Sequence, residues 1–194
     1  MTTASQYPLA RGALLALLLL NGGMFLVETV AGWRAESMGL VADGLDMGAD
    51  GAVYLLALLA VSASDSRKLA AARFAGNVQL VLAALAMLEV LRRLVVGSAP
   101  EPPVMIGVSL AAIVVNLICL LVLRRHREGE VHLQAAWIFS ATDVQANLAV
   151  LAAALLVAWT GSPMPDLVIG VVICGLVLRS ALRIRARVRA ATPA

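Results

Sequence analysis

The sequence predicts an all-α, polytopic membrane protein built as a bundle of six transmembrane helices. Hydrophobic residues make up 61% of the 194 residues, and the mean hydropathy is +0.92. The apolar residues are gathered into blocks of about twenty, which is the length that a helix needs to cross a bilayer. Because the polar stretches between the blocks are short, we expect residues 1–194 to form a single transmembrane domain with no soluble domain.

Six apolar blocks define the expected spans, and proline and glycine separate several of them. Pro100, Pro102 and Pro103 fall between the third block and the fourth, and Gly161 and Pro163 fall between the last two. The first block is longer than the core of a cleavable signal, so we expect it to be a permanent span. The spans are expected at residues 12–33, 38–63, 75–96, 104–123, 133–159 and 165–182.

Basic residues gather on one side of the predicted spans. Arg11, Arg67, Arg124 and the tail over residues 183–189 flank that side, whereas Arg34 flanks the other. By the positive-inside rule we expect both termini in the cytoplasm, as for a protein of a bacterial inner membrane. The tail holds no aromatic residue, which favours a topological role and contact with the lipid bilayer over binding of nucleic acid.

Three carboxylates interrupt the second apolar block. Each of Asp43, Asp46 and Asp50 would cost ~2.5 to 3.5 kcal/mol at membrane depth, so something must offset them. Their spacings of three and four residues place them along one face of a helix. A purely structural interpretation is that they pair with arginine or donate hydrogen bonds that hold the helices together. Since the arginines near membrane depth lie toward the ends of the spans, we favour a bound cation.

Other acids can reach the same depth. With ~1.5 Å of rise per helical residue, Glu28 in the first span and Asp43 share a level near the outer side. Asp46 and Asp50 approach the midplane, and so does Asp143 in the fifth span. Carboxylates from two helices can therefore converge on one divalent metal ion, for which protons would compete. Asn147 and Ser140 lie about one turn to either side of Asp143.

Two other groups of polar or reactive residues have simpler interpretations. Glu89 has Arg92 and Arg93 three and four residues later, so we expect a local ion pair near one end of the third span. Cys119 and Cys174 lie inside apolar blocks, so we expect them to be small core residues rather than a disulfide.

With these residues in place, the chain resembles the cation diffusion facilitator family over nearly all of its length. Asn116 fits the asparagine of the family's fourth span, Glu28 fits the glutamate of its first span, and Leu178-Arg179-Ser180-Ala181 resembles the end of its sixth. The pattern of the second span is matched by Gly32, Ser37, Ala42, Asp43, Asp46 and Asp50.

The resemblance implies a transporter rather than an enzyme, one that exports a divalent transition-metal cation from the cytoplasm in exchange for protons. It implies no cofactor; the cargo would be an ion such as Zn²⁺, Cd²⁺, Co²⁺, Mn²⁺ or Fe²⁺. The expected metal ligands are Asp46, Asp50 and Asp143, with Asp43, Glu28, Ser140 and Asn116 as secondary or pathway residues.

The sequence departs from the family pattern in two ways. Where the fifth span of the family carries His-x-x-x-Asp, this chain has Phe139 before Asp143, so a nitrogen ligand is lost. Asn147, Ser140, Asp43 or a water must then supply the fourth ligand, and we expect Asn147. The family's cytoplasmic metal-binding domain also has no counterpart here, so a homodimer would have to form through the transmembrane region.

Two alternatives remain at this stage. CDP-alcohol phosphotransferases also arrange aspartates around divalent metal within helices, but the Ala-Arg that should follow Asp43-Gly44 is missing. The chain could also bind metal without transporting it, which would give binding by purified protein and no flux in vesicles.

Overall fold

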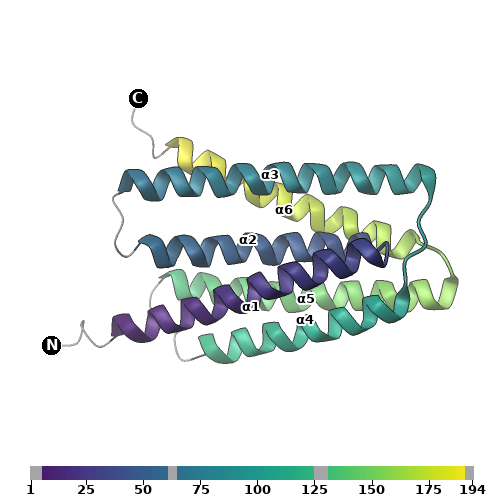
Figure 1. The fold of residues 1–194 in the computed structure, drawn as a ribbon, viewed down its shortest axis with the longest axis horizontal. Helices are drawn as coiled ribbons and strands as arrows, with labels where there is room; N and C mark the ends of the chain where they lie inside the picture. The colour runs from purple at the N-terminus through teal and green to yellow at the C-terminus, as the bar shows by residue number, and fades with distance from the viewer. Residues whose placement is uncertain (1–5, 61–64, 125–130, 191–194) are drawn as a thin grey trace.

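A computed structural model describes residues 6–60, 65–124 and 131–190. Within these ranges the regular secondary structure is entirely helical, which confirms the all-α class and the predicted number of helices. The six helices are α1 (Gln6–Arg34), α2 (Met38–Ala60), α3 (Asp65–Val96), α4 (Pro102–Leu123), α5 (Val131–Thr160) and α6 (Met164–Ala190) (Figure 1).

Three helices extend beyond the predicted spans. The helical backbone starts at residue 6 in α1 and at residue 65 in α3, and it continues to residue 190 in α6. The prediction followed the apolar blocks, whereas intrahelical hydrogen bonds continue past the point where a helix leaves the hydrocarbon. All three extensions lie at the end of the bundle where α1 begins and α6 ends (Figure 1).

Five helices of the described part are long and apolar enough to cross a membrane, and α2 is not among them. The 23 residues of α2 include Asp43, Asp46 and Asp50. A helix with this composition must be screened from lipid by its neighbours. The five apolar stretches are Arg11–Arg34, Arg73–Val96, Pro102–Leu123, Ser140–Thr160 and Met164–Arg183.

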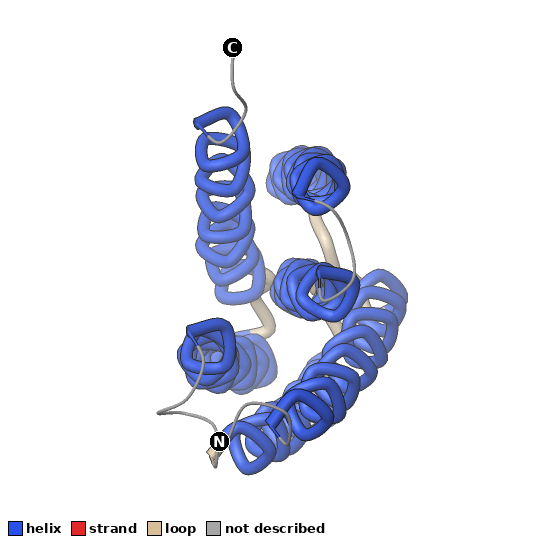
Figure 2. Tube along the Cα trace, turned by 90° about the vertical axis from the view of Figure 1, so that its left-hand side faces the viewer, coloured by secondary structure: helices blue, strands red, loops and turns tan. Residues whose placement is uncertain are grey.

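The packing of the helices meets this requirement, since α2 contacts each of the other five. Helices α1, α2, α5 and α4 close a ring in which each contacts the next, and α3 pairs with α6 against the outside of α2. Several helices run nearly along the axis of the bundle, whereas the helix leading to the C-terminus and a helix at the lower right of the view are inclined to it (Figure 2). The acids of α2 can therefore face the interior of the ring.

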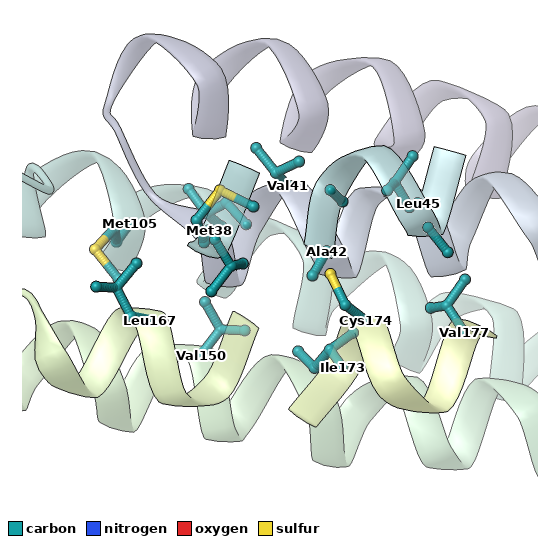
Figure 3. Packing of buried hydrophobic residues seen from close by; sticks show 14 of the residues in the cluster. Met38, Val41, Ala42, Leu45, Met105, Val150, Leu167, Ile173, Cys174 and Val177 are labelled. Atoms are coloured by element: carbon teal, nitrogen blue, oxygen red, sulfur yellow. The ribbon is translucent and has the colours of Figure 1, made fainter. Parts of the chain in front are cut away.

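The largest apolar cluster lies between α2 and α6 (Figure 3). Met38 is fully buried there on the side of Leu167 of α6, and Ala42 lies beside Cys174. Lipid tails are as apolar as these side chains, so association depends on close packing at small residues. A Cβ on Gly170 would lie 2.8 Å from Cβ of Met38, which shows how closely the two backbones approach.

Both cysteines have the simple role that the sequence predicted. Cys119 and Cys174 are buried and neither forms a disulfide. Each lies in an apolar cluster, Cys174 between α2 and α6 and Cys119 beside Tyr54 and Leu123.

Replacing Gly170 by alanine should destabilise the protein, because the new methyl group would meet the backbone of α2 at Met38. We expect a loss of about 1–3 kcal/mol in the free energy of unfolding in detergent micelles. Gly175→Ala is the matched control on the same helix, since a Cβ there would meet nothing within 4 Å. Equal thermal stability of the two variants would contradict the close contact between α2 and α6.

Candidate metal centre

The predicted acids are collected inside the ring of α1, α2, α4 and α5. Glu28, Asp43 and Asp143 are 0%, 1% and 5% exposed. Asp46 and Asp50 are only half-buried. The site therefore combines fully enclosed carboxylates with two that retain some access from outside.

The acids of α2 and α5 act on one another across the ring. Asp143 lies within electrostatic range of Asp50, Asp46 and Asp43. Glu28 also lies within electrostatic range of Asp143, so four other acids act on this side chain. The carboxyl group of Glu28 is a neighbour of that of Asp43. These placements put Asp143 opposite Asp50 and Asp46, and Glu28 beside Asp43.

Among the described side chains, no three of the His, Cys, Asp and Glu residues are close enough to hold one metal ion as they stand. A bound ion would therefore have to draw the carboxylates of α2 and α5 closer together. It would also need a donor that is neither a carboxylate, a thiol nor an imidazole.

Buried asparagines offer such a donor. The Nδ2 group of Asn147 donates to the carbonyl oxygen of Asp143 at 2.9 Å, and that of Asn21 donates to the carbonyl oxygen of Leu17 at 2.9 Å. Both side chains are completely buried, and neither Oδ1 atom has a hydrogen-bond partner. Because the donor half of each amide is bonded to its own helix, the oxygen half is left available to a cation.

Asn116 of α4 also keeps a buried amide oxygen without a partner, although its nitrogen faces a different helix, α2. Its Nδ2 group lies 4.0 Å from Sδ of Met47.

The ring as a whole contains many buried oxygen atoms without hydrogen-bond partners. Each such atom costs about 1–3 kcal/mol, and native proteins rarely keep many of them unless they serve a function. Oxygen atoms with free lone pairs are the donors that a hard or borderline cation needs. These oxygens belong to Asn21, Glu28, Thr29, Asp43, Asp50, Tyr54, Ser109, Asn116, Ser140, Asp143 and Asn147.

Glycines allow α1 to approach α2 closely enough to bring Glu28 beside Asp43. A Cβ on Gly44 would lie 2.7 Å from Oγ1 of Thr29, and one on Gly48 would lie 2.8 Å from Cδ2 of Phe25. These glycines fall between the acids of α2, so the residues that space the acids also set the distance to α1.

The glutamate of α3 has a different role. Glu89 accepts hydrogen bonds from Arg92 at 2.7 Å and from Arg93 at 2.8 Å, which confirms the predicted local ion pair. Arg92 and Arg93, two of the arginines near membrane depth, are therefore bonded to a carboxylate of their own helix, α3.

Comparison with known proteins decides the family. Residues 14–187 match the model of the cation efflux transmembrane domain. The chain belongs to the cation efflux family. It is 28% identical to the zinc transporter ZitB of Escherichia coli (strain K12) over 177 residues, which cover 84% of this chain and 56% of that protein. It is 26% identical to the zinc transporter ZitB of Yersinia pestis over 175 residues, which cover 83% and 56%.

Membership of the cation efflux family confirms the resemblance noted in the sequence. The matched relatives are transporters, which sets aside the phosphotransferase alternative. The chain spans little more than half the length of these relatives.

Two positions of this cation efflux protein need separate comment. Phe139 belongs to α5, one turn before Asp143, but its side chain lies outside the described part of the structure. Asp166 of α6 was not predicted as a functional residue, yet it is fully buried and accepts hydrogen bonds from Ser37, Met38 and Gly39. A signal was present, since Ser37 stands where a helix N-cap is expected.

Removing one charge from the acids of the ring should stabilise the metal-free protein. Asp46→Asn keeps the shape of the side chain and removes a half-buried charge, so we expect a gain in the free energy of unfolding on the order of 1 kcal/mol at pH 8, measured by thermal unfolding in detergent. Glu89→Gln should change stability in the opposite direction, because that carboxylate is bonded to two arginines. A larger loss for Asp46→Asn than for Glu89→Gln would contradict the assignment.

Proposed function

We propose that this member of the cation efflux family exports a divalent transition-metal cation from the cytoplasm in exchange for protons. The observation that carries the proposal is the set of buried oxygen atoms without partners inside the ring of α1, α2, α4 and α5. Desolvated carboxylates and amide oxygens favour a cation more strongly than anything else that could reach them in a bilayer. The matched relatives are named as zinc transporters, which supports the same class of cargo.

The metal ligands that we propose are Asp46, Asp50 and Asp143, with Oδ1 of Asn147 as the fourth donor. Asp46 and Asp50 lie one helical turn apart, so both carboxylates can reach one ion. Asn147 is positioned for this role because its amide nitrogen is already held by the carbonyl group of Asp143. The partial exposure of Asp46 and Asp50 gives an ion access to the site.

An all-oxygen set of ligands bears on the choice of metal. Zn²⁺ accepts carboxylate oxygens at about 2.0–2.2 Å and tolerates four ligands. Compared with a site that contains histidine, an all-oxygen site should have a higher relative affinity for harder ions such as Mn²⁺ and a lower one for Cd²⁺. We propose Zn²⁺ as the first cargo to test, with Cd²⁺, Co²⁺, Mn²⁺ and Fe²⁺ as competitors.

Protons and the metal would bind the same carboxylate oxygens in turn. Protonation neutralises the carboxylates and weakens their hold on the ion, and loss of those protons to the cytoplasm prepares the site again. Glu28 and Asp43 would form the outward path, because they are neighbours, fully buried and one turn beyond Asp46. Ser140 and Asn116 contribute oxygens at the margins of the same ring.

The proposed orientation follows from charge and from the path of the chain. Helix α1 begins and α6 ends on the same side of the bundle (Figure 1). We assign that side to the cytoplasm of a bacterial inner membrane, because the basic residues flank it. Residues 1–194 would then act as one transmembrane domain, and a second copy of the chain could associate through this region.

Transport into sealed proteoliposomes with an imposed pH gradient tests the proposal. Asp50→Asn and Asp143→Asn should each reduce proton-driven Zn²⁺ uptake at least about tenfold, because even supporting residues of metal sites cost that much. Glu101→Gln, which changes an exposed carboxylate, is the control and should retain uptake. Unchanged uptake in both aspartate variants would refute the site. Zn²⁺ binding without any flux in the unmodified chain would instead favour a non-transporting metal-binding protein.

Restoring a nitrogen donor tests the ligand set from the other direction. Phe139→His places an imidazole one turn before Asp143, and it should tighten Zn²⁺ and Cd²⁺ binding about tenfold, or about 1.4 kcal/mol. Phe139→Leu is the matched control, since leucine offers no donor. Equal affinities of the two variants, measured by titration calorimetry, would show that this position does not face the metal.

A further inference from the structure

The first turn of α2 is bonded to a carboxylate from another helix. Asp166 of α6 accepts hydrogen bonds from Oγ of Ser37 at 2.6 Å, from the backbone N–H of Met38 at 2.7 Å and from that of Gly39 at 3.0 Å. Oγ of Ser37 in turn accepts from the N–H of Leu40 at 3.2 Å. The first three N–H groups of α2 therefore all have acceptors.

These bonds matter because of where α2 begins. The first N–H groups of any helix lack partners within it, and away from water each one costs free energy if left unpaired. Ser37, Asp166 and the residues they bond are all buried. A local serine cap satisfies one of the N–H groups, and only a side chain from α6 satisfies the other two.

Close backbone contact reinforces the bond. A Cβ on Gly39 would lie 3.0 Å from Oδ1 of Asp166 and 3.0 Å from Cγ2 of Ile169, and one on Gly170 would lie 2.8 Å from Cβ of Met38. Figure 3 shows Met38 against Leu167 in this region. The start of α2 therefore cannot slide along or rotate against α6 without breaking hydrogen bonds and creating clashes.

The charge of Asp166 is also offset, unlike that of the acids in the ring. The positive end of the α2 dipole points at it. Arg93 lies within electrostatic range, and its own side chain is held by Glu89 at 2.8 Å and lies 6.0 Å from the ring centroid of Trp33. Both Asp166 oxygens accept hydrogen bonds from protein groups, and these three bonds occupy most of the acceptor sites of the carboxylate.

We infer that Asp166 is a positioning residue for the metal site, an inference that rests on the proposed function. Helix α2 is continuous from Met38 to Ala60, and Asp46 lies seven residues, or about 10 Å, beyond the bonded Gly39. Fixing the first turn fixes the depth and rotation of Asp46 and Asp50 opposite Asp143. The carboxylate of α6 thus sets the geometry in which the acids of α2 meet the acid of α5, and it joins the α3–α6 pair to the metal-bearing helix.

Zn²⁺ titration of the full chain in detergent, together with thermal unfolding, tests this inference. Asp166→Ala should weaken Zn²⁺ binding about tenfold or more, as loss of supporting residues does in other metal sites. Ser37→Ala should weaken it less, and Ser37→Thr, which keeps the hydroxyl group, should restore it. If Asp166→Ala fails to fold, Asp166→Asn, which retains one acceptor oxygen, should show the same loss of affinity in smaller measure.

A matched control separates positioning from general stability. Leu123→Ala removes a buried side chain from the end of α4, which lies in the apolar cluster with Leu14 and Tyr54 and not in the one around Met38, and it should lower thermal stability while leaving Zn²⁺ affinity unchanged. Wild-type affinity in a folded Asp166 variant, or an equal loss of affinity in Leu123→Ala, would overturn the inference.

Two further titrations distinguish failure of the positioning role of Asp166 from failure of the proposed metal site. If Asp50→Asn abolishes binding and Asp166→Ala retains it, only the positioning role is wrong. If the unmodified chain does not bind Zn²⁺, both the proposed site and the positioning role are wrong.

Discussion

The constraint on which the structure depends is the presence of three aspartates on α2, of which Asp43 is buried and Asp46 and Asp50 are half-buried. A helix with these residues cannot face lipid, and α2 accordingly contacts all five other helices, while the apolar helices form the outside of the bundle. Enclosure removes water from the carboxylates and leaves several of their oxygen atoms without hydrogen-bond donors. The result is a group of oxygen atoms in the interior whose cost is offset only when a cation or protons bind.

The acids of the described helices include two groups with different surroundings. Asp166 and Glu89 have their oxygens bonded to N–H groups, a hydroxyl or arginine, so they stabilise the arrangement of helices. Glu28, Asp43, Asp50 and Asp143 each keep at least one buried oxygen without a partner. The first group holds the bundle in shape, and the second is available for chemistry. Asp166 connects the two, because it fixes the start of the helix that carries the second group.

Local patterns in the sequence predicted most of the fold, and contacts between distant residues account for what they missed. Apolar blocks reveal spans, and helical periodicity reveals that Asp43, Asp46 and Asp50 share a face. Asp166 and Ser37 are 129 residues apart in the sequence, so no local spacing of residues could reveal the hydrogen bond between them. Likewise, the orientation of Asn147 depends on which carbonyl its amide nitrogen meets. Residues 125–130, between α4 and α5, lie outside the described ranges.

The most direct test of the central claim is X-ray absorption spectroscopy of the Zn²⁺-loaded protein. Coordination by Asp46, Asp50, Asp143 and Asn147 predicts a first shell of oxygen atoms at about 2.0–2.2 Å, without the outer-shell signal of an imidazole ring. Asp143→Asn should retain less protein-bound Zn²⁺ after gel filtration, because one of the proposed ligands loses its charge. A first shell containing sulfur at about 2.3 Å, or a clear imidazole pattern, would contradict an oxygen site built from these residues.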